Sequence, residues 1–444
     1  MRLRTATVAS LLATACLAAS AAAAPPNVVF FLIDDLGSGD CGFAGGTEIK
    51  TPRIDAIAAA GTILESLYVQ PVCSPTRACL MTGRYPTRTG VYTVVRPGAA
   101  WGLPLQERTL AQSLKDAGYQ TAISGKWHLG EFEPAYLPLA RGFDRQYGHY
   151  FGAIDYFAHT RDGDRDWYRD DRPLREEGYS TDLLATEACR MIAGRDPAKP
   201  LFLYVPFNGV HSPYQVPARY TAPYAGIAND RRRTLAGMLA AVDEAIGRIV
   251  DSLAQAGIRE ETLIIFSGDN GGCRPGTNGP LRDFKGSLYE GGIRTCGFVT
   301  WPGRVPAGGR TAEPIHTVDW FPTLVSLAGG ELDGGQPLDG RDVWPVITRG
   351  AKSPHEAILV AKGPAHAAVR MGDWKLIAGD GGDELYDLAT DLGEQNDRAA
   401  GEPDRVRAMR ATLAELLAEA VPPGSTEPTK RPRRGRRPAT ATAP

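Results

Sequence analysis

The sequence lacks both an excess of one charge and an internal repeat. Its 49 lysines and arginines nearly balance its 51 aspartates and glutamates, which gives a formal net charge of -2. Such a chain has no global field that would attract nucleic acid. No repeating period of the kind that marks solenoid proteins is found. These absences favour a globular protein, and 444 residues suffice for one large core and a smaller second domain.

Cysteines are few, and none form a C-x-x-C pair. The seven cysteines are scattered at positions 16, 41, 73, 79, 189, 273 and 296. This scatter argues against a structural zinc site, whose thiolate ligands come in closely spaced pairs. An exported protein can join some of its cysteines, but the sequence alone assigns no disulfide.

Outside the N-terminus there is no apolar run long enough to span a bilayer. The N-terminus itself, MRLRTATVASLLATACLAASAAAAPP, has a basic end, a short apolar run and small residues at a cleavage site. Residues 1–24 are therefore predicted to be a secretory signal peptide, cut after Ala24. The protein is expected to be exported to the periplasm or the medium. A less favoured alternative is cleavage after Ala15, which would make Cys16 a lipid-bearing residue.

Short apolar segments bounded by turn residues recur through the chain. They are NVVFFLID (27–34), TAISGK (121–126), PLFLYVPF (200–207), TLIIFSGD (262–269) and CGFVTWP (296–302). Their β-branched and aromatic side chains are typical of buried strands. Between them lie amphipathic stretches that end at or near glycine: TPRIDAIAAAG, TLAQSLKDAGY and RRTLAGMLAAVDEAIGRIVDSLAQAG. The alternation predicts an α/β fold with a mostly parallel sheet between helices, over a main domain at 25–330.

The pattern changes after about residue 330. GGELDGGQPLDG resembles a linker, and EAILVA, HAAVRMG, DWKLIAG and DELYDL follow as short predicted strands before a last helix, PDRVRAMRATLAELLAEA. We expect a small antiparallel subdomain at 331–421. The end of the chain, 422–444, is rich in proline and arginine and is predicted to be disordered. A solvated tail is favoured there over a polyanion-binding segment.

Carboxylates follow two of the predicted strands. Asp34 and Asp35 end the first strand, and Asp269 and Asn270 end the strand at 262–269. Ligands of open α/β sheets bind outside the carboxyl ends of the strands, so these side chains are expected to converge. Oxygen donors without nearby imidazole or thiolate suit Ca²⁺ or Mg²⁺ rather than zinc. The alternative is that the two aspartates only cap the next element.

The stretch CSPTR places Cys73 at the start of a helix-like run. The free N–H groups of a helix N-terminus hold anions well. A cysteine there can be a nucleophile of low pKa or simply a small buried residue. SGKWHLG adds Lys126 and His128, which the alternation of a strand would point to one side. HSPYQVP adds His211, and a glycine-bounded loop adds Lys285. Such groups beside a metal would bind a sulfate or phosphate group and protonate its leaving group.

Taken together, these blocks resemble the type I sulfatases of the alkaline-phosphatase-like superfamily. CSPTR matches that family's C-x-P-x-R signature, and ACLMTGRYPTRTG, GKWHLG, HSPYQVP, SGDNGG and FKGSLYEGGIR match further family blocks in the same order. The resemblance covers roughly residues 26 to 400. It implies a mixed-sheet α/β domain with a smaller C-terminal antiparallel domain, and a sulfuric ester hydrolase of the arylsulfatase type.

The resemblance implies that Cys73 is a precursor. In such sulfatases a separate formylglycine-generating enzyme oxidises the cysteine to Cα-formylglycine, whose hydrate has two hydroxyls. One attacks the sulfur of the ester, and the other later loses its proton and expels sulfate. Asp34, Asp35, Asp269 and Asn270 would bind Ca²⁺ together with the modified residue.

The remaining roles are carried over in the same way. Arg77 would orient the hydrated aldehyde, and Lys126 and Lys285 would hold sulfate oxygens. His211 would be the general acid for the leaving alcohol. His128 would help to deprotonate the hydrate.

Within the family, the chain resembles the arylsulfatase B group, which includes N-acetylgalactosamine-4-sulfatase. The blocks that carry this likeness are GRYPTRTG, LARGFDRQYGHYFGAIDYFAH, HSPYQVP and AHAAVRMGDWKL. It implies a sulfated carbohydrate as the substrate, with His366 as a further substrate-binding residue. Tyr156, His159 and Arg161 are expected in the sugar pocket.

Three other functions remain in competition. The first is a phosphonate monoester or phosphodiester hydrolase of the same superfamily. The second is a non-catalytic protein that binds sulfated glycans, which would not need the complete set of site residues. The third is a thiol enzyme that uses Cys73 unmodified, for which the sequence shows no paired histidine.

Overall fold

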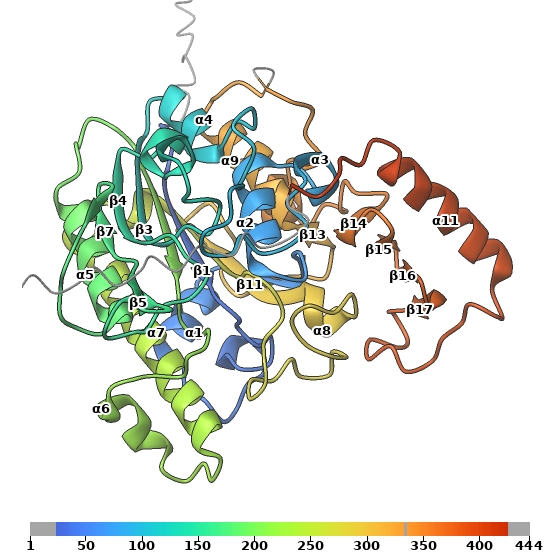
Figure 1. Cartoon of the computed structure of the whole chain (residues 1–444), viewed down its shortest axis with the longest axis horizontal. Coiled ribbons are helices and arrows are strands. Elements are labelled where there is room, and N and C mark those ends of the chain that lie inside the picture. The colour runs from blue at the N-terminus through green and yellow to red at the C-terminus, as the bar shows by residue number, and fades with distance from the viewer. Residues whose placement is uncertain (1–23, 333–334, 425–444) are drawn as a thin grey trace, which may run out of the picture.

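A mixed sheet runs through the centre of the protein and carries helices on both faces (Figure 1). The computed structural model describes residues 24–332 and 335–424. In sheet order the strands are β12 (Gly309–Thr311), β2 (Thr62–Tyr68), β11 (Arg294–Thr300), β10 (Thr262–Gly268), β1 (Asn27–Ile33), β9 (Leu201–Phe207), β3 (Gln120–Lys126), β4 (Arg145–His149), β7 (Tyr168–Arg169) and β8 (Arg172–Pro173), with β13 (Ile315–His316) paired to β2.

The centre of this sheet is parallel. β1 pairs in parallel with β9 and β10, and β3 pairs in parallel with β9 and β4. All five segments predicted as strands form strands, and the mostly parallel sheet is confirmed. β11 instead runs antiparallel to β10, since the chain between them stays at one edge of the sheet. The Gly271 amide, just after β10, donates to the Gly292 carbonyl just before β11. β2, which the sequence did not reveal, pairs with β11.

Helices cover both faces because β1 is apolar on both sides. Its residues Val29, Phe31 and Ile33 pack into one core cluster with α1 (Pro52–Ala59), α5 (Ser180–Ala193) and α7 (Asp230–Gln255). The alternate residues of β1 pack into a second cluster with α2 (Cys73–Thr82), α4 (Leu110–Asp116), α9 (Trp320–Leu327) and α10 (Trp344–Arg349). The predicted sandwich of helices around a sheet is therefore what the structure has.

Shorter elements connect these layers. The short α-helices are α3 (Pro86–Thr89), α6 (Ala218–Thr221) and α8 (Glu290–Ile293). The 3₁₀ helices are η1 (Gly42–Ala44), η2 (Pro134–Tyr136), η3 (Leu139–Arg141), η4 (Ala222–Tyr224), η5 (Arg259–Glu261) and η6 (Thr317–Asp319). β5 (Thr160–Arg161) and β6 (Asp164–Arg165) form a separate two-stranded ribbon.

A second, antiparallel sheet lies at one end of the molecule, as predicted from the C-terminal pattern (Figure 1). Its strands are β14 (Ile358–Gly363), β15 (His366–Met371), β16 (Trp374–Gly379) and β17 (Gly382–Asp387), joined in sequence order. The last helix, α11 (Pro403–Leu417), packs on this sheet through Met409 and Leu413.

Three predictions concern the ends and the boundary of the domains. The boundary at 330 precedes α10, whose Val346 and Ile347 pack into the main core rather than under the second sheet. The predicted tail begins at residue 422, but the Gly424 amide donates to the Gly90 carbonyl at 2.9 Å. The rest of that tail and nearly all of the predicted signal segment, Cys16 included, lie outside the described residues. Among the described helices, none combines the length and the apolar character needed to cross a bilayer.

A buried ion cluster joins the two sheets. The Lys375 ammonium of β16 lies 2.9 Å from Glu290 of α8 and 2.5 Å from Glu394. All three side chains are within 1% of complete burial. Burial opposes ionisation of Glu290, but the charges of Lys375 and Arg294 outweigh it and lower its pKa to about 2. The second sheet is thus fixed to the main domain by buried ion pairs, in which each charge stabilises its partner.

We expect Lys375→Met to lower the free energy of unfolding at pH 7 by about 3–5 kcal/mol, because it leaves Glu394 buried without its cation and leaves Glu290 with Arg294 alone. Denaturant unfolding followed by circular dichroism measures this. The matched control is Lys352→Met, since Lys352 is 91% exposed in its pair with Glu313 and its loss should leave the free energy of unfolding nearly unchanged.

The deficit of the Lys375→Met variant should shrink in acid. In the wild type the lowered pKa of Glu290 gives stability that is present above about pH 4.5 and is lost as the pH falls towards about 2. In the variant the carboxylates that have lost Lys375 bind protons more readily when folded, so the variant loses stability as the pH rises. A deficit that stays constant from pH 7 to pH 3 would contradict the ion cluster as its cause.

Candidate active site

The acidic residues that follow β1 and β10 meet at the carboxyl edge of the sheet. Ile33 at the end of β1 stands opposite Gly268 at the end of β10. The polar residues after the two strands therefore leave the sheet at the same level. The Asp269 amide donates to the Ile33 carbonyl at 3.1 Å, and the Asp35 amide donates to Asp269 Oδ1 at 3.2 Å. The structure brings together the residues predicted to converge here: Asp34, Asp35, Asp269 and Asn270.

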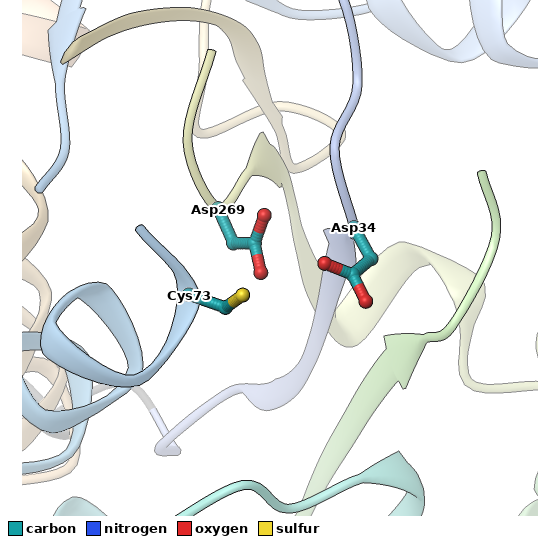
Figure 2. Close-up of side chains that lie close together, drawn as sticks. All are labelled: Asp34, Cys73 and Asp269. Carbon is teal, nitrogen blue, oxygen red and sulfur yellow. The ribbon is translucent and has the colours of Figure 1, made fainter. Parts of the chain in front are cut away.

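Cys73 is the first residue of α2, and its side chain points at the carboxylates (Figure 2). One ligand atom from each of Cys73, Asp34 and Asp269 lies within 4.8 Å of the others. Cys73 is 2% exposed. Burial raises the pKa of its thiol, although Lys126 and Lys285 act in the opposite direction. Of the two interpretations of the unmodified cysteine, the structure favours the small buried residue over the low-pKa nucleophile, which leaves the thiol-enzyme alternative without electrostatic support.

Three cations from distant segments pair with the three carboxylates. Arg77 of α2 donates to Asp269 Oδ2 at 2.8 Å and to the Lys126 carbonyl at 2.9 Å. Lys126, the last residue of β3, donates to Asp34 Oδ2 at 2.6 Å. Lys285 donates to Asp35 Oδ1 at 2.5 Å, and its ammonium lies 3.4 Å from Cys73 Sγ. The predicted cations thus surround both the acidic cluster and the cysteine.

Two buried oxygens of this cluster have no hydrogen-bond partner. They are Asp34 Oδ1 and Asn270 Oδ1. The Asn270 amide group donates to Asp35 Oδ1 at 2.8 Å and to the Gly271 carbonyl at 3.0 Å, so its oxygen is turned away from both. A buried polar atom without a partner costs stability, and an oxygen accepts either a proton or a cation. These oxygens fit a hard divalent cation.

The buried carboxylates of the cluster have pKa values that are shifted in opposite directions. Burial and the neighbouring Asp34 raise the pKa of Asp269 to about 6, despite Arg77 and Lys126. Burial also opposes ionisation of Asp34, but Lys126, His211 and Arg77 outweigh it and hold its pKa far below the usual range. A bound divalent cation would favour the ionised form of both.

His128 follows β3 but is not part of it. The strand ends at Lys126, and His128 has a positive φ of 62°, so the alternation argument does not apply to it. The residue is nevertheless held beside Cys73, since the Ser74 hydroxyl donates to its carbonyl; burial, Lys126 and Arg77 lower the pKa of its ring. Its Nε2 lies 2.9 Å from the Val95 carbonyl, which can only accept, and its Nδ1 has no partner. In the neutral ring the proton sits on Nε2 and the Nδ1 lone pair can accept one.

His211 closes the other side of the cluster. Its Nε2 lies 3.6 Å from Asp35 Oδ2, and its Nδ1 donates to the Ser212 carbonyl at 2.5 Å. The pKa of this histidine is lowered, because the effect of burial outweighs the opposing charge of Asp35. The side chain is 19% exposed, so it reaches both the buried carboxylate and the solvent. That is the position needed by a group that exchanges protons with a leaving alcohol.

Of the three residues expected in the sugar pocket, one lines a cavity beside His211 and two do not. Arg161 lines a cavity beside His211. Tyr156 and His159 do not, since both are at most 1% exposed and lie within the fold. The Tyr156 hydroxyl hydrogen-bonds to the carbonyls of Asn208 and His211, at 2.6 and 2.7 Å, so it holds the loop of His211 instead. His159 stacks on Trp167.

His366 stands apart from the cluster. It begins β15 in the second sheet, is exposed, and its ring lies against Gly379. None of its contacts among the described residues joins it to the acidic cluster, so its role in substrate binding stays a prediction.

Sequence reasoning missed two residues that support the site. The Cys273 thiol donates to Asp35 Oδ2 at 3.3 Å, and it directly follows the SGDNGG block. The Ser74 hydroxyl donates to the His128 carbonyl at 2.9 Å and accepts from the Val95 amide at 3.1 Å. Ser74 belongs to the CSPTR stretch, so its place in the sequence could have indicated a role in the site. The sequence did not indicate that its partners would be His128 and Val95, which lie on other segments.

Comparison with known proteins gives a consistent result. The family model described as Sulfatase matches residues 26–330. Arylsulfatase J of Mus musculus is 41% identical over 78% of this chain, and the match spans 60% of that relative's length. N-acetylgalactosamine-6-sulfatase of Canis lupus familiaris is 34% identical over 82% of this chain and 74% of its own length.

A solved structure agrees with these sequence relatives. The crystal structure of Ps i-CgsB in complex with k-i-k-neocarrahexaose is 32% identical and covers 90% of this chain and 94% of its own. The TM-score is 0.85. At that identity and coverage the likeness extends beyond the central sheet to nearly the whole chain.

We expect a hard divalent cation to stabilise the protein, because it would satisfy the two orphaned oxygens and screen three buried carboxylates. Protein stripped with a chelator should unfold at a lower temperature than the same protein with added Ca²⁺. At a free concentration 100 times the Kd, the gain would be about 2.7 kcal/mol. Differential scanning calorimetry measures the shift.

Two variants make this test specific. Asn270→Ala removes one orphaned oxygen and should reduce the Ca²⁺-dependent shift. Asp243→Asn is the control, because Asp243 is a buried carboxylate that accepts backbone hydrogen bonds from Arg53 and Ile54 elsewhere in the main domain. The shift should survive in that variant. Equal unfolding temperatures with and without Ca²⁺ in the wild type would refute a cation site.

Proposed function

Because the chain belongs to the sulfatase family, we propose that it hydrolyses sulfate esters of a sulfated carbohydrate, with a formylglycine made from Cys73 and with Ca²⁺. One observation carries this proposal. The N-terminal residue of a buried helix faces two carboxylates of a three-carboxylate cluster, and three cations pair with that cluster. A non-catalytic glycan binder would need neither the orphaned oxygens nor a proton acceptor held at His128.

The acidic cluster is the proposed cation site. Asp34, Asp35, Asp269 and Asn270 would hold Ca²⁺, together with an oxygen of the modified Cys73. When bound, the ion supplies charge neutralisation for the sulfate oxygens and favours ionisation of a hydroxyl nucleophile. The orphaned oxygens of Asp34 and Asn270 support this assignment, since neither has another partner.

The start of α2 is the proposed position of the nucleophile. A hydrated formylglycine at Cys73 supplies one hydroxyl that attacks sulfur and a second whose ionisation releases sulfate. Cys73 lies at a helix N-terminus, where the helix dipole favours negative charge. Arg77, on the same helix and fully buried, would orient this group through its fixed fork of N–H donors.

The two lysines would bind the sulfate. Lys285 lies within 3.4 Å of Cys73 Sγ, and Lys126 lies on the opposite side at Asp34. Each now donates to a carboxylate. With a cation bound to those carboxylates, the ammonium groups would have N–H donors to spare for the sulfate oxygens. Preorganised donors of this kind stabilise the charge that develops in the transition state.

Two histidines would move protons on opposite sides of the ester. His128, neutral and with its Nδ1 lone pair unpartnered, would accept the proton from the hydrate when sulfate is released. His211, partly exposed, would donate a proton to the leaving oxygen of the sugar. This division gives one base and one acid with separate environments.

An N-acetylgalactosamine-4-sulfate-like ester is the proposed substrate. One relative is named N-acetylgalactosamine-6-sulfatase, and another was solved in complex with k-i-k-neocarrahexaose. The 4-position comes from the resemblance to the arylsulfatase B group, as does the proposed contact of His366. Export, and maturation by a formylglycine-generating enzyme, belong to the same proposal.

Mass spectrometry of Cys73 tests the proposal directly. In protein made in its native host, we expect the tryptic peptide 54–77 to carry an aldehyde in place of the thiol. Cys73→Ala should lower sulfate release by on the order of 10³-fold or more. Cys79→Ala, also on α2, is the control and should keep the aldehyde. An unmodified cysteine in active protein would overturn the mechanism.

The role of His211 predicts a dependence on the leaving group. His211→Ala should slow hydrolysis of a sugar sulfate by about 10²–10⁴-fold, since an alcohol leaves poorly without a proton. It should change hydrolysis of 4-nitrophenyl sulfate by less than about 10-fold, because that leaving group needs little help. Steady-state kinetics on both substrates measures the ratio, and the aryl ester controls for folding. Equal losses on both would assign His211 another role.

The same assays separate the sulfatase from the phosphonate or phosphodiester hydrolase of this superfamily. Turnover of 4-nitrophenyl sulfate should exceed that of bis(4-nitrophenyl) phosphate and of phenyl phosphonate esters under equal conditions. A strong preference for the phosphorus esters would exclude the proposed function.

A further inference from the structure

A cavity of about 490 Å³ opens directly beside His211. Its walls come from two loops, at residues 153–155 with 160–162 and at residues 211–213. The first loop includes the β5 strand of the two-stranded ribbon. The second is the loop that carries His211 out of the buried cluster. None of the acidic cluster residues lines this cavity, so it is a separate space next to the reacting centre.

The position of His211 indicates what the cavity would bind. A general acid must lie beside the oxygen that leaves with the sugar. The sugar therefore extends from the sulfate past His211, and the cavity on that side is where the rest of the carbohydrate would lie. This step rests on the proposed function of His211.

Arg161 brings the one guanidinium among the residues that line the cavity. Its side chain is 34% exposed. Its carboxylate partner is Asp162, at 3.7 Å and 82% exposed. A pair this long and this exposed is weak. The planar guanidinium can therefore turn to a carboxylate or sulfate of a ligand, for which its paired donors are well matched.

The other carboxylate of this wall is already satisfied. Asp155 accepts from Gln215 Nε2 at 2.7 Å and from the backbone amides of Phe157 and Ala158 at 2.9 and 2.7 Å. These bonds fix the loop and turn the carboxylate oxygens towards donors of the protein, although Asp155 keeps its negative charge. The lining thus combines a hydrogen-bonded carboxylate with a loosely paired cation.

An exposed aromatic ring lies next to the same loop. Phe157 is 45% exposed and rests on Tyr179, with ring centroids 5.4 Å apart. Tyr179 stacks in turn on Tyr156, whose hydroxyl holds the His211 loop. The exposed ring and the catalytic loop are therefore built on one aromatic stack. Aromatic side chains that hold their place in this way offer an apolar face to a sugar ring.

We propose that this cavity is a glycan subsite in which Arg161 pairs with an anionic group of the sugar next to the one that loses sulfate. The substrate is then a polyanionic oligosaccharide rather than a monosaccharide or a simple aryl sulfate. The anionic group is a carboxylate, as in a uronic acid, or a second sulfate. Phe157 supports a sugar ring at the rim of the subsite.

Steady-state kinetics of Arg161→Ala test this with four probes. A chondroitin 4-sulfate tetrasaccharide offers a neighbouring carboxylate, and a neocarrahexaose sulfated on adjacent sugars offers a neighbouring sulfate. N-acetylgalactosamine 4-sulfate and 4-nitrophenyl sulfate offer neither. We expect KM to rise on the order of 10-fold for at least one oligosaccharide, with little change in kcat. KM for the two small probes should be unchanged. The oligosaccharide that responds identifies the anion.

Control variants keep the result interpretable. Arg165→Ala removes the same charge from the other strand of the ribbon, outside the cavity lining, and should leave every KM unchanged. Arg161→Lys should recover part of the affinity, and Phe157→Ala should raise KM for the oligosaccharides alone.

Several outcomes would overturn the subsite. These are equal KM changes on all four probes, no change on either oligosaccharide, or a wild-type KM no lower for the oligosaccharides than for the monosaccharide. Each would leave the proposed function standing as long as 4-nitrophenyl sulfate is hydrolysed. Loss of that hydrolysis in the mature wild-type protein would instead refute the proposed function.

Discussion

The constraint that organises this protein is the burial of three carboxylates at the ends of two adjacent strands. Asp34 and Asp269 are fully buried and Asp35 is 5% exposed. Charges buried in this way are tolerated only when they are paired. The cations that pair with them come from the middle of α2, the end of β3 and the loop before α8, so the acidic cluster holds three distant segments in place. Removing any one cation would leave a buried carboxylate without the cationic side chain that now donates to it.

The second sheet contributes to the same site without reaching it. Lys285 lies on the loop between β10 and α8, and Arg282 of that loop donates to the Glu394 carbonyl at 2.6 Å. The Glu290 amide, at the start of α8, donates to the Glu394 carboxylate at 2.6 Å. Lys375 of β16 then forms ion pairs with both glutamates. The C-terminal part of the chain thus fixes one of the cations that surround Cys73.

The parts of the fold that the sequence predicted are those governed by local pattern. The five central strands are continuous apolar runs, and polar residues at their ends must meet where parallel strands end together. What failed depended on the path of the backbone or on distant contacts. β11 runs antiparallel because the chain after β10 never leaves the carboxyl edge. His128 departs from strand alternation through a positive φ. Nothing in the sequence around Tyr156 and His159 reveals that Trp167 and Tyr179 bury them.

These differences divide the site into two halves with different physical requirements. The half that would carry out the chemistry stands on strand ends and a helix N-terminus, where every side chain is held by burial and by opposite charge. Few other residues can satisfy that geometry, so its sequence blocks are specific and point to one family. The half that would hold the sugar stands on the loops at 153–162 and 211–213, which are partly exposed and make fewer obligatory contacts. Such loops tolerate many sequences on one scaffold. The sequence therefore predicts the type of reaction but does not predict which sugar is bound.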